Sequence, residues 1–389
     1  MIELSKAAHY VSDKINVSSL KIEEYITTDN MIPNRGGVVD CESLPKAKRV
    51  TRYEPGDILI SNIRPYFKKI WFSDRISGCS NDVIVFRAND ENWNKKFLYY
   101  VLSQDSFFDF MMSGSNGTKM PRGNKKTIPE FLIPDFDIDK QIRIADILSA
   151  YDSLIENNQK QIKLLEEAAQ RLYKEWFVDL RFPGYEDVKI VDGVPEGWKK
   201  ERAECFFKIT IGKTPPRAEK QWFVNGNNGI PWLSISDMRD AGTFIFKTRE
   251  GLTEEAIKKH NMKIVPSGTI FVSFKLTVGR VAIATTEMCT NEAIAHFYVN
   301  DSLQAYTYCY LSNFEYDTLG NTSSISKAVN SKIIKAMPFI MPSQDIIENF
   351  SMIVSPILNE IKAKQEMCNY LSEARDRLLP KLMSGEIEV

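Results

Sequence analysis

The longest regular pattern in the chain is an apolar stripe between residues 144 and 176. Its members recur alternately four and three residues apart over more than four heptads. A period of 3.5 residues is typical of a coiled-coil helix. Asn158 occupies one core position, where an amide costs stability but would fix the register of a helix pair. The stripe comprises Ile144, Leu148, Tyr151, Ile155, Asn158, Ile162, Leu165, Ala169, Leu172 and Trp176.

A second, less regular stripe lies near the end of the chain. Lys364 stands where the first stripe has Asn158, and Pro356 removes one backbone hydrogen bond, so we expect a kink or a delayed helix start. One such helix alone is compatible with a solvated strut, but two in one chain favour helices that bury their stripes against each other. The stripe comprises Phe350, Ile353, Ile357, Ile361, Cys368, Leu371 and Leu378.

Short β-branched and aromatic runs precede each stripe, as in D-I-L-I at 57–60 and T-I-F-V at 269–272. Gly-, Pro- and Asn-rich turns separate these runs, so each region reads as a β-rich globular domain with a few helices. The predicted class is therefore α+β. The expected segments are globular domains at 1–136 and 195–342, long helices at 137–179 and 343–383, a linker at 180–194 and a tail at 384–389.

The chain contains an internal repeat with an offset of 206 to 212 residues. S-G-C-S-N-D-V-I-V-F-R at 77–87 matches E-M-C-T-N-E-A-I-A-H-F at 287–297, and E-P-G-D-I-L-I-S at 54–61 matches P-S-G-T-I-F-V-S at 266–273. E-A-A-Q-R-L in the first stripe matches E-A-R-D-R-L in the second. A period this long indicates two duplicated domains, not a solenoid.

Composition excludes some classes of protein and leaves others open. The 389 residues are 43% hydrophobic and 26% charged, with a net charge of -1, so any surface for nucleic acid must be local. The six cysteines include no C-x-x-C pair, which indicates reduced thiols. The chain shows neither a signal peptide nor an apolar run of the ~18 residues that a membrane span needs, and we expect a cytoplasmic protein.

Catalytic motifs fail on inspection. I-G-K-T at 211–214 lacks the upstream glycine of a phosphate-binding loop, because Phe207 stands there, and two prolines follow it. Three histidines without helical pairing do not suggest a metal site. C-T-N-E-A-I-A-H-F at 289–297 resembles a thiol–imidazole pair, but the first copy has Phe86 in place of His296. We therefore interpret both copies as a turn that leads into a buried strand.

Polar loops without acidic residues remain as candidate chemistry. Residues 113–126 and their counterpart from residue 320 both combine Gly, Asn and Ser or Thr with lysines. Cations meet phosphates, and Arg, Asn, Ser and Thr read base edges, so these loops favour DNA contact over plain solvated loops. The residues expected to bind DNA are Arg64, Lys68, Lys119, Arg122, Lys125, Lys126, Lys213, Arg217, Lys220, Lys275, Arg280, Lys327, Asn330 and Lys332.

The layout resembles the specificity subunit of type I restriction–modification enzymes across essentially the whole chain. The resemblance rests on G-K-T-P-P with G-I-P-W-L-S-I-S-D-M, on C-T-N-E-A-I-A, on W-F-V-D-L-R-F-P-G with V-P-E-G-W, and on the closing R-D-R-L-L-P-K-L-M-S-G-E-I. It implies two target recognition domains and an antiparallel coiled coil with approximate twofold symmetry. The chain departs from the usual Glu-Gln at the helix starts, with Asp139-Lys140-Gln141 and Gln344-Asp345.

The resemblance also implies a function. Each domain would read one half of a bipartite, asymmetric target in double-stranded DNA, and helices of about 50 Å, at ~1.5 Å per residue, would set the spacing. The chain would carry no catalytic residue, metal or cofactor. Two modification subunits would bring S-adenosylmethionine and methylate adenine, and two restriction subunits would bring ATP and Mg²⁺. The alternatives are a coiled-coil scaffold whose domains bind proteins, and an autonomous enzyme.

Overall fold

The computed structural model describes the whole chain except residues 116–119, 276 and 320–328. The chain divides into two compact units. Unit 1 comprises Met1–Ile155 with Tyr370–Val389, and unit 2 comprises Glu156–Asn369. Each long helix contributes residues to both units, since α4 spans Ile138–Tyr173 and α10 spans Gln344–Ser384.

Unit 1 contains two antiparallel sheets, ordered β2-β8-β5-β6 and β3-β4-β7, and the short pair β1-β9. Helices α2 and α3 follow strand β8. The elements are β1 (Ile2–Glu3), α1 (Leu4–Ala7), β2 (Ala8–Tyr10), β3 (Lys14–Asn16), β4 (Arg49–Tyr53), β5 (Ile58–Ser61), β6 (Ile70–Phe72), β7 (Ser77–Cys79), β8 (Val83–Ala88), α2 (Lys95–Leu102), α3 (Asp105–Ser113) and β9 (Leu132–Ile133).

Unit 2 has a sheet ordered β13-β21-β18-β19-β16, a second ordered β14-β17-β15-β20, and the pairs β12-β22 and β10-β11. Its elements are β10 (Ile190–Val191), β11 (Val194–Pro195), β12 (Lys199–Arg202), α5 (Ala203–Phe206), β13 (Lys208–Ile211), β14 (Phe223–Asn225), β15 (Ile230–Leu233), α6 (Ile235–Asp240), β16 (Phe244–Ile245), β17 (Glu250–Leu252), α7 (Glu254–Lys259), β18 (Ile270–Ser273), β19 (Val281–Ala284), β20 (Cys289–Thr290), β21 (Ile294–Tyr298), α8 (Asp301–Asn313), α9 (Ser331–Lys335) and β22 (Pro338–Met341).

The central strands are apolar on both faces because both faces are covered. In β5, Ile58 and Ile60 belong to the large core of unit 1, whereas Leu59 belongs to a smaller core between the sheets. In β18 of unit 2, Ile270 and Val272 face one core and Phe271 faces another. Successive side chains of a strand alternate between its faces, so a continuous apolar run is what such a strand requires.

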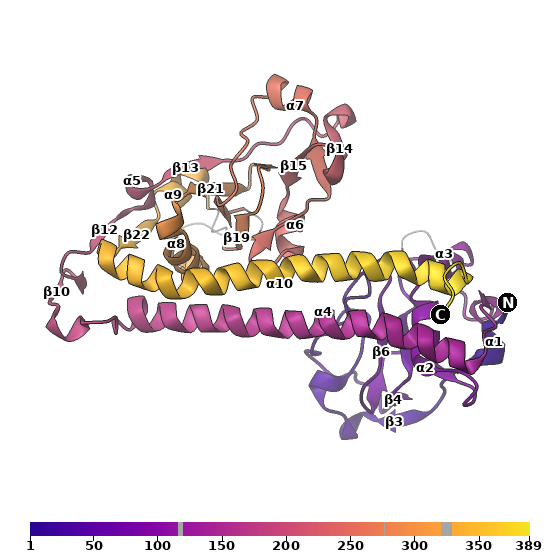
Figure 1. The fold of residues 1–389 in the computed structure, drawn as a ribbon. Coiled ribbons are helices and arrows are strands. Elements are labelled where there is room, and N and C mark those ends of the chain that lie inside the picture. Colours follow the sequence, from indigo (N-terminus) through magenta and orange to yellow (C-terminus); the bar gives the residue numbers. More distant parts are fainter. Residues whose placement is uncertain (116–119, 276, 320–328) are drawn as a thin grey trace. The chain divides into compact units, whose positions relative to one another are not determined.

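Within each unit the two long helices run in opposite directions and share a core (Figure 1). In unit 2, Tyr173 near the end of α4 contacts Phe350 near the start of α10. In unit 1, Arg375 of α10 forms an ion pair with Asp152 of α4 at 2.7 Å, and the hydroxyl of Tyr100 donates to the same carboxylate at 2.5 Å. The predicted antiparallel coiled coil is confirmed.

The second predicted stripe lies partly on the wrong face of its helix. Ile353 is 47% exposed, whereas Val354 is fully buried and Leu358 nearly so. The delayed helix start expected from Pro356 is wrong, since α10 begins at Gln344 and continues through this proline. Pro356 lies on the exposed side, and it leaves unbonded the carbonyl of Met352, an exposed residue, which water can reach.

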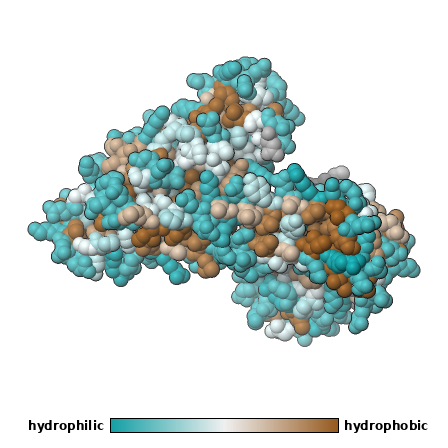
Figure 2. Space-filling model, viewed as in Figure 1, coloured by the Kyte–Doolittle hydropathy of each residue, from teal (hydrophilic) through white to brown (hydrophobic). Residues whose placement is uncertain are grey.

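Other features of the surface bear on function. Across the described ranges, no helix combines the length and the apolar character that crossing a membrane requires. Figure 2 shows a surface on which hydrophilic side chains predominate, interrupted by hydrophobic groups. Large apolar side chains that are at least half exposed on the long helices include Leu154, Leu164, Met352, Met367 and Tyr370.

Candidate nucleic-acid interface

Equivalent hairpin turns present predicted DNA-binding residues in the two units. The turn between β5 and β6, residues 62–69, carries Arg64 and Lys68. The turn between β18 and β19, residues 274–280, carries Lys275 and Arg280. Each turn follows a buried serine whose hydroxyl donates to a carbonyl inside the turn, Ser61 to Ile63 at 3.0 Å and Ser273 to Thr277 at 2.6 Å.

In unit 1 a second predicted loop joins this hairpin turn. The backbone amide of Arg64 donates to the carbonyl of Pro121 at 2.8 Å, and that of Gly123 donates to the carbonyl of Asn62 at 3.3 Å. Ile63 and Arg122 form an isolated β-bridge between the same segments. Residues that are about sixty positions apart in the sequence thus form one cationic surface.

Some of these cations have acidic partners and others do not. Arg122 pairs with Asp82 at 3.2 Å and Lys68 with Asp105 at 2.8 Å. The Nε of Arg64 is buried, and no hydrogen-bond partner for it exists among the described residues. The ammonium of Lys125 donates to the carbonyl of Asn81 at 3.3 Å. The Arg122–Asp82 pair is half-exposed, so it contributes little to stability.

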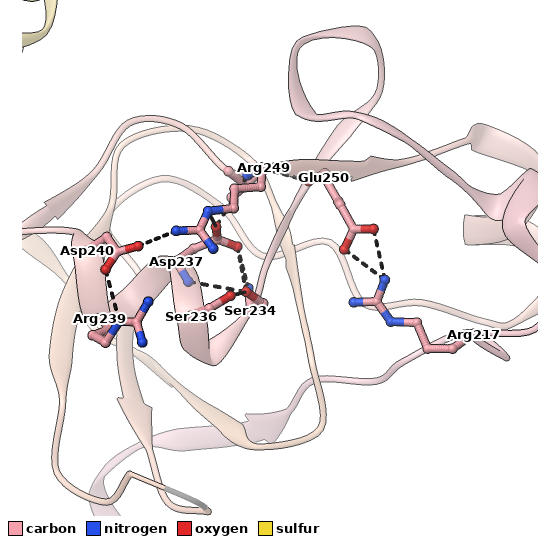
Figure 3. Close-up of polar contacts among 9 residues, drawn as sticks. Arg217, Ser234, Ser236, Asp237, Arg239, Asp240, Arg249 and Glu250 are labelled. Carbon is pink, nitrogen blue, oxygen red and sulfur yellow. Dashed lines mark hydrogen bonds and ion pairs between the residues drawn. The ribbon is translucent and has the colours of Figure 1, made fainter. Parts of the chain in front are cut away.

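Two predicted residues of unit 2 are occupied by structural contacts. The guanidinium of Arg217 donates to both carboxylate oxygens of Glu250 at 2.8 and 2.9 Å (Figure 3), and it lies 4.3 Å from the ring centroid of Phe223. The side-chain oxygen of Asn330 accepts from the backbone amides of Lys332 and Ile333 and so caps helix α9. Stacking and capping are sufficient reasons for these residue types at these places.

The remaining predicted residues are mostly exposed. The ammonium of Lys213 donates to the carbonyl of His260 at 2.7 Å, and that of Lys275 lies 5.7 Å from the ring of Phe274. Lys126, Lys220 and Lys332 are exposed. Lys119 and Lys327 lie outside the described residues.

Sequence reasoning missed a cavity of about 540 Å³ in unit 2, whose lining includes both apolar and charged side chains. Arg249 lines it and pairs with Asp240 and, at 3.8 Å, with Asp237 (Figure 3). Asp237 also completes a capping box with Ser234 at the start of α6. The only signal was S-I-S-D, which is a helix start and gives no indication of a cavity.

The thiol and imidazole of the C-T-N-E-A-I-A-H-F segment are not equipped for catalysis. Burial raises the pKa of Cys289 to about 12. Burial and the charge of Lys263 lower the pKa of His296 to about 3. The ring nitrogens of His296 form hydrogen bonds with the hydroxyls of Thr210 at 2.9 Å and Thr290 at 2.6 Å. A neutral thiol and a neutral, fully bonded imidazole form part of a core, not a nucleophile and its base.

Comparison with known proteins agrees with the duplication. The family model described as "Type I restriction modification DNA specificity domain" matches residues 43–167 and again residues 195–367. A type I restriction enzyme specificity subunit of Methanocaldococcus jannaschii, MjaIX, is 28% identical over 76% of this chain and 69% of its own length. The HindI specificity subunit of Haemophilus influenzae is 24% identical over 99% of this chain and 98% of its own.

A solved structure shares the fold. The type I restriction–modification S subunit from M. genitalium aligns with a TM-score of 0.53 at 17% identity, over 98% of this chain and 99% of that one. The two matches to the family model cover well over half of the chain. The chain therefore belongs to the type I restriction–modification DNA specificity family, as its repeat and its paired helices indicated.

Proposed function

We propose that this specificity subunit reads its DNA target in two halves, one with each unit. The observation that carries the proposal is the duplication of the specificity domain, in which each copy presents cations on an equivalent hairpin turn. Lysine and arginine side chains on such turns neutralise phosphates, and neighbouring polar groups reach base edges in the major groove. The chain is the recognition subunit and not the catalytic one.

The proposed assembly follows from this division of labour. Two modification subunits dock on the long helices and the adjoining domains and supply S-adenosylmethionine chemistry on adenine. Two restriction subunits supply ATP-dependent translocation and cleavage with Mg²⁺, and the chain itself binds none of these cofactors. The complex acts in the cytoplasm on double-stranded DNA. Half-exposed apolar residues on the helices, such as Leu164 and Met367, support a docking role.

Sequencing of methylated bases tests the proposal directly. A host that carries this chain together with its modification subunit should show one bipartite methyladenine motif, with two specified halves and an unspecified gap. A protein scaffold would leave no such motif. A continuous, ungapped motif would contradict reading in two halves.

Single substitutions can show which unit of the chain reads which half of the DNA target. Arg122→Ala should weaken recognition of one half-site and Lys275→Ala recognition of the other. Each loss of a phosphate contact should make the slope of the logarithm of the binding constant against the logarithm of the salt concentration shallower by about 0.9. Lys200→Ala, on the exposed strand β12 outside both turns, is the matched control and should change neither half. Equal losses on both half-sites from one substitution would refute the assignment.

A further inference from the structure

The hairpin turn of unit 1 exposes two aromatic rings between its cations. Tyr66 is 47% exposed and Phe67 is 37% exposed, and their ring centroids are 4.7 Å apart. Both rings belong to the short 3-10 turn Pro65–Phe67, which Arg64 precedes and Lys68 follows. In the equivalent turn of unit 2 the aromatic residue, Phe274, is fully buried. The exposed pair is thus a feature of unit 1 and not of the fold.

The backbone on either side of the rings is held in a costly conformation. Arg64 and Lys68 have φ values of 50° and 52°, in the left-handed region that residues with a side chain rarely adopt. The segment that faces this turn is also left-handed at Asn34 and Arg35, with φ of 57° and 63°. A non-glycine residue persists in this conformation only where neighbours over-determine it, and such residues gather at functional sites.

Those neighbours are present. The backbone amide of Asn34 donates to the carbonyl of Phe67 at 2.8 Å, and that of Arg35 donates to the carbonyl of Lys68 at 2.9 Å. The carboxylate of Asp105, at the start of α3, pairs with both Arg35 and Lys68. Burial acts to raise the pKa of Asp105, but these two cations lower it overall. The rings therefore stand on a rigid base.

The surroundings of the rings are cationic, which favours DNA over a protein as the partner. Lys69 lies 5.8 Å from the ring centroid of Phe67. The turn is joined through Arg64 and Pro121 to the loop that carries Arg122, and Met120, 48% exposed, adds apolar surface beside it. An exposed apolar tip flanked in the chain by Arg64 and Lys68 is complementary to a duplex whose phosphates lie on either side of the base edges.

We infer that Tyr66 and Phe67 contact thymine methyl groups in the major groove of the half-site that unit 1 reads. The inference rests on the proposed function. In the major groove the thymine methyl is the apolar feature of the base edges, and aromatic side chains are among those that pack on it. A methylated half-site contains at least one thymine, because the target adenine pairs with it. The turn would thereby specify bases as well as position phosphates.

The test uses the complex of the full chain with its modification subunit, on a duplex that carries the motif read from methylated DNA. Each thymine of the half-site that responds to Arg122→Ala is replaced in turn by deoxyuridine, which lacks only the methyl group. Removal of one buried methyl should weaken binding about fourfold at one or two positions. The double variant Tyr66→Ala with Phe67→Ala should bind the thymine duplex more weakly and lose the difference between thymine and deoxyuridine.

Ile76→Ala is the matched control. Ile76 is a 51% exposed apolar residue of the same unit, beyond the opposite end of β6, and its variant should retain the full deoxyuridine effect. The inference is overturned if no thymine responds to deoxyuridine, or if the double variant keeps the response. It is also overturned if the double variant no longer assembles with the modification subunit, because the rings would then be a protein contact. Absence of any bipartite motif would instead refute the proposed function.

Discussion

At the scale of residues, one carboxylate in each repeat contacts a loop that is predicted to bind DNA. Asp82 pairs with Arg122 in unit 1, and Glu292 accepts a hydrogen bond from Thr214 in unit 2. Burial acts to raise the pKa of Glu292, but the Thr214 hydrogen bond and nearby cations lower it overall. The sequence predicts the turn, because its motif is local. It cannot predict the partners, which lie 40 and 78 positions away.

Cys289 should be dispensable for DNA modification. Cys289→Ser leaves a hydroxyl in a fully buried site, where an unpaired polar group costs about 1–3 kcal/mol of the free energy of unfolding. The methylation pattern of the assembled complex should be unchanged. Cys205→Ser, at an exposed cysteine, is the control for both measurements. Loss of methylation by a Cys289→Ser variant that still folds would show that the thiol takes part in chemistry.

His296 should make the chain less stable in mild acid. Its pKa is lowered from 6.5 to about 3 in the folded state, so below pH 6.5 the unfolded chain binds a proton that the folded chain excludes. The stabilisation by neutral His296 is therefore complete above pH 6.5 and declines towards pH 3, at most by about 1.4 kcal/mol per pH unit. Urea unfolding at pH 7 and pH 5 measures the slope. His296→Gln, which does not titrate, should remove this part of it, and an unchanged slope would contradict the assignment.

At the scale of elements, the two long helices show what periodicity can and cannot predict. The first stripe is correct at Ile144, Leu148 and Ala169, which are buried. The second stripe fails at Ile353 because α10 is covered on two sides, by α4 and by the domain of unit 2. The hydroxyl of Ser351, for example, donates to the carbonyl of Ser302 in α8. A helix that packs against two neighbours has a wide apolar face. The spacing of its apolar residues therefore does not show which of them face the other long helix.

Adjacent residues of α10 should therefore differ sharply in their effect on stability. Val354→Ala removes two fully buried methyl groups and leaves a cavity, and it should cost about 2 kcal/mol of the free energy of unfolding. Ile353→Ala removes more atoms from an exposed site and should stay within about 0.5 kcal/mol of wild type. Chemical denaturation of both variants measures the difference. Equal costs would restore Ile353 to the helix seam.

At the scale of the whole molecule, the duplication is the feature that the sequence reveals most fully. It predicts two related units, and the sheet orders β2-β8-β5-β6 and β13-β21-β18-β19 correspond strand by strand. The candidate site is less predictable. The sequence shows which loop residues are cationic or polar, but it does not show their contacts. Arg217 stacks on Phe223 and Asn330 caps helix α9, although neither residue type differs from those expected to bind DNA. The exposure of Tyr66 and Phe67 is not predictable from the sequence, because aromatic residues are more often part of a core.

The lengths of the long helices should set the gap between the two half-sites. One heptad inserted after Ile155 in α4 and a matching heptad before Tyr370 in α10 preserve the 3.5-residue seam and add about 10 Å. That length corresponds to about three base pairs of a duplex that rises ~34 Å per turn. Methylated-base sequencing should show the same two half-sequences with a wider gap, and weaker methylation because the added base pairs also rotate one half-site.

A seven-residue insertion at Gly193 separates the effect of helix length from that of chain length. Gly193 lies in the turn between β10 and β11, and a Cβ added there would meet no atom within 4 Å, so the insertion should be accommodated without altering either helix. The gap should then stay as in the wild type. If the paired heptads also left the gap unchanged while methylation persisted, the helices would not measure the target, and the spacing would have to come from the partner subunits that hold the DNA.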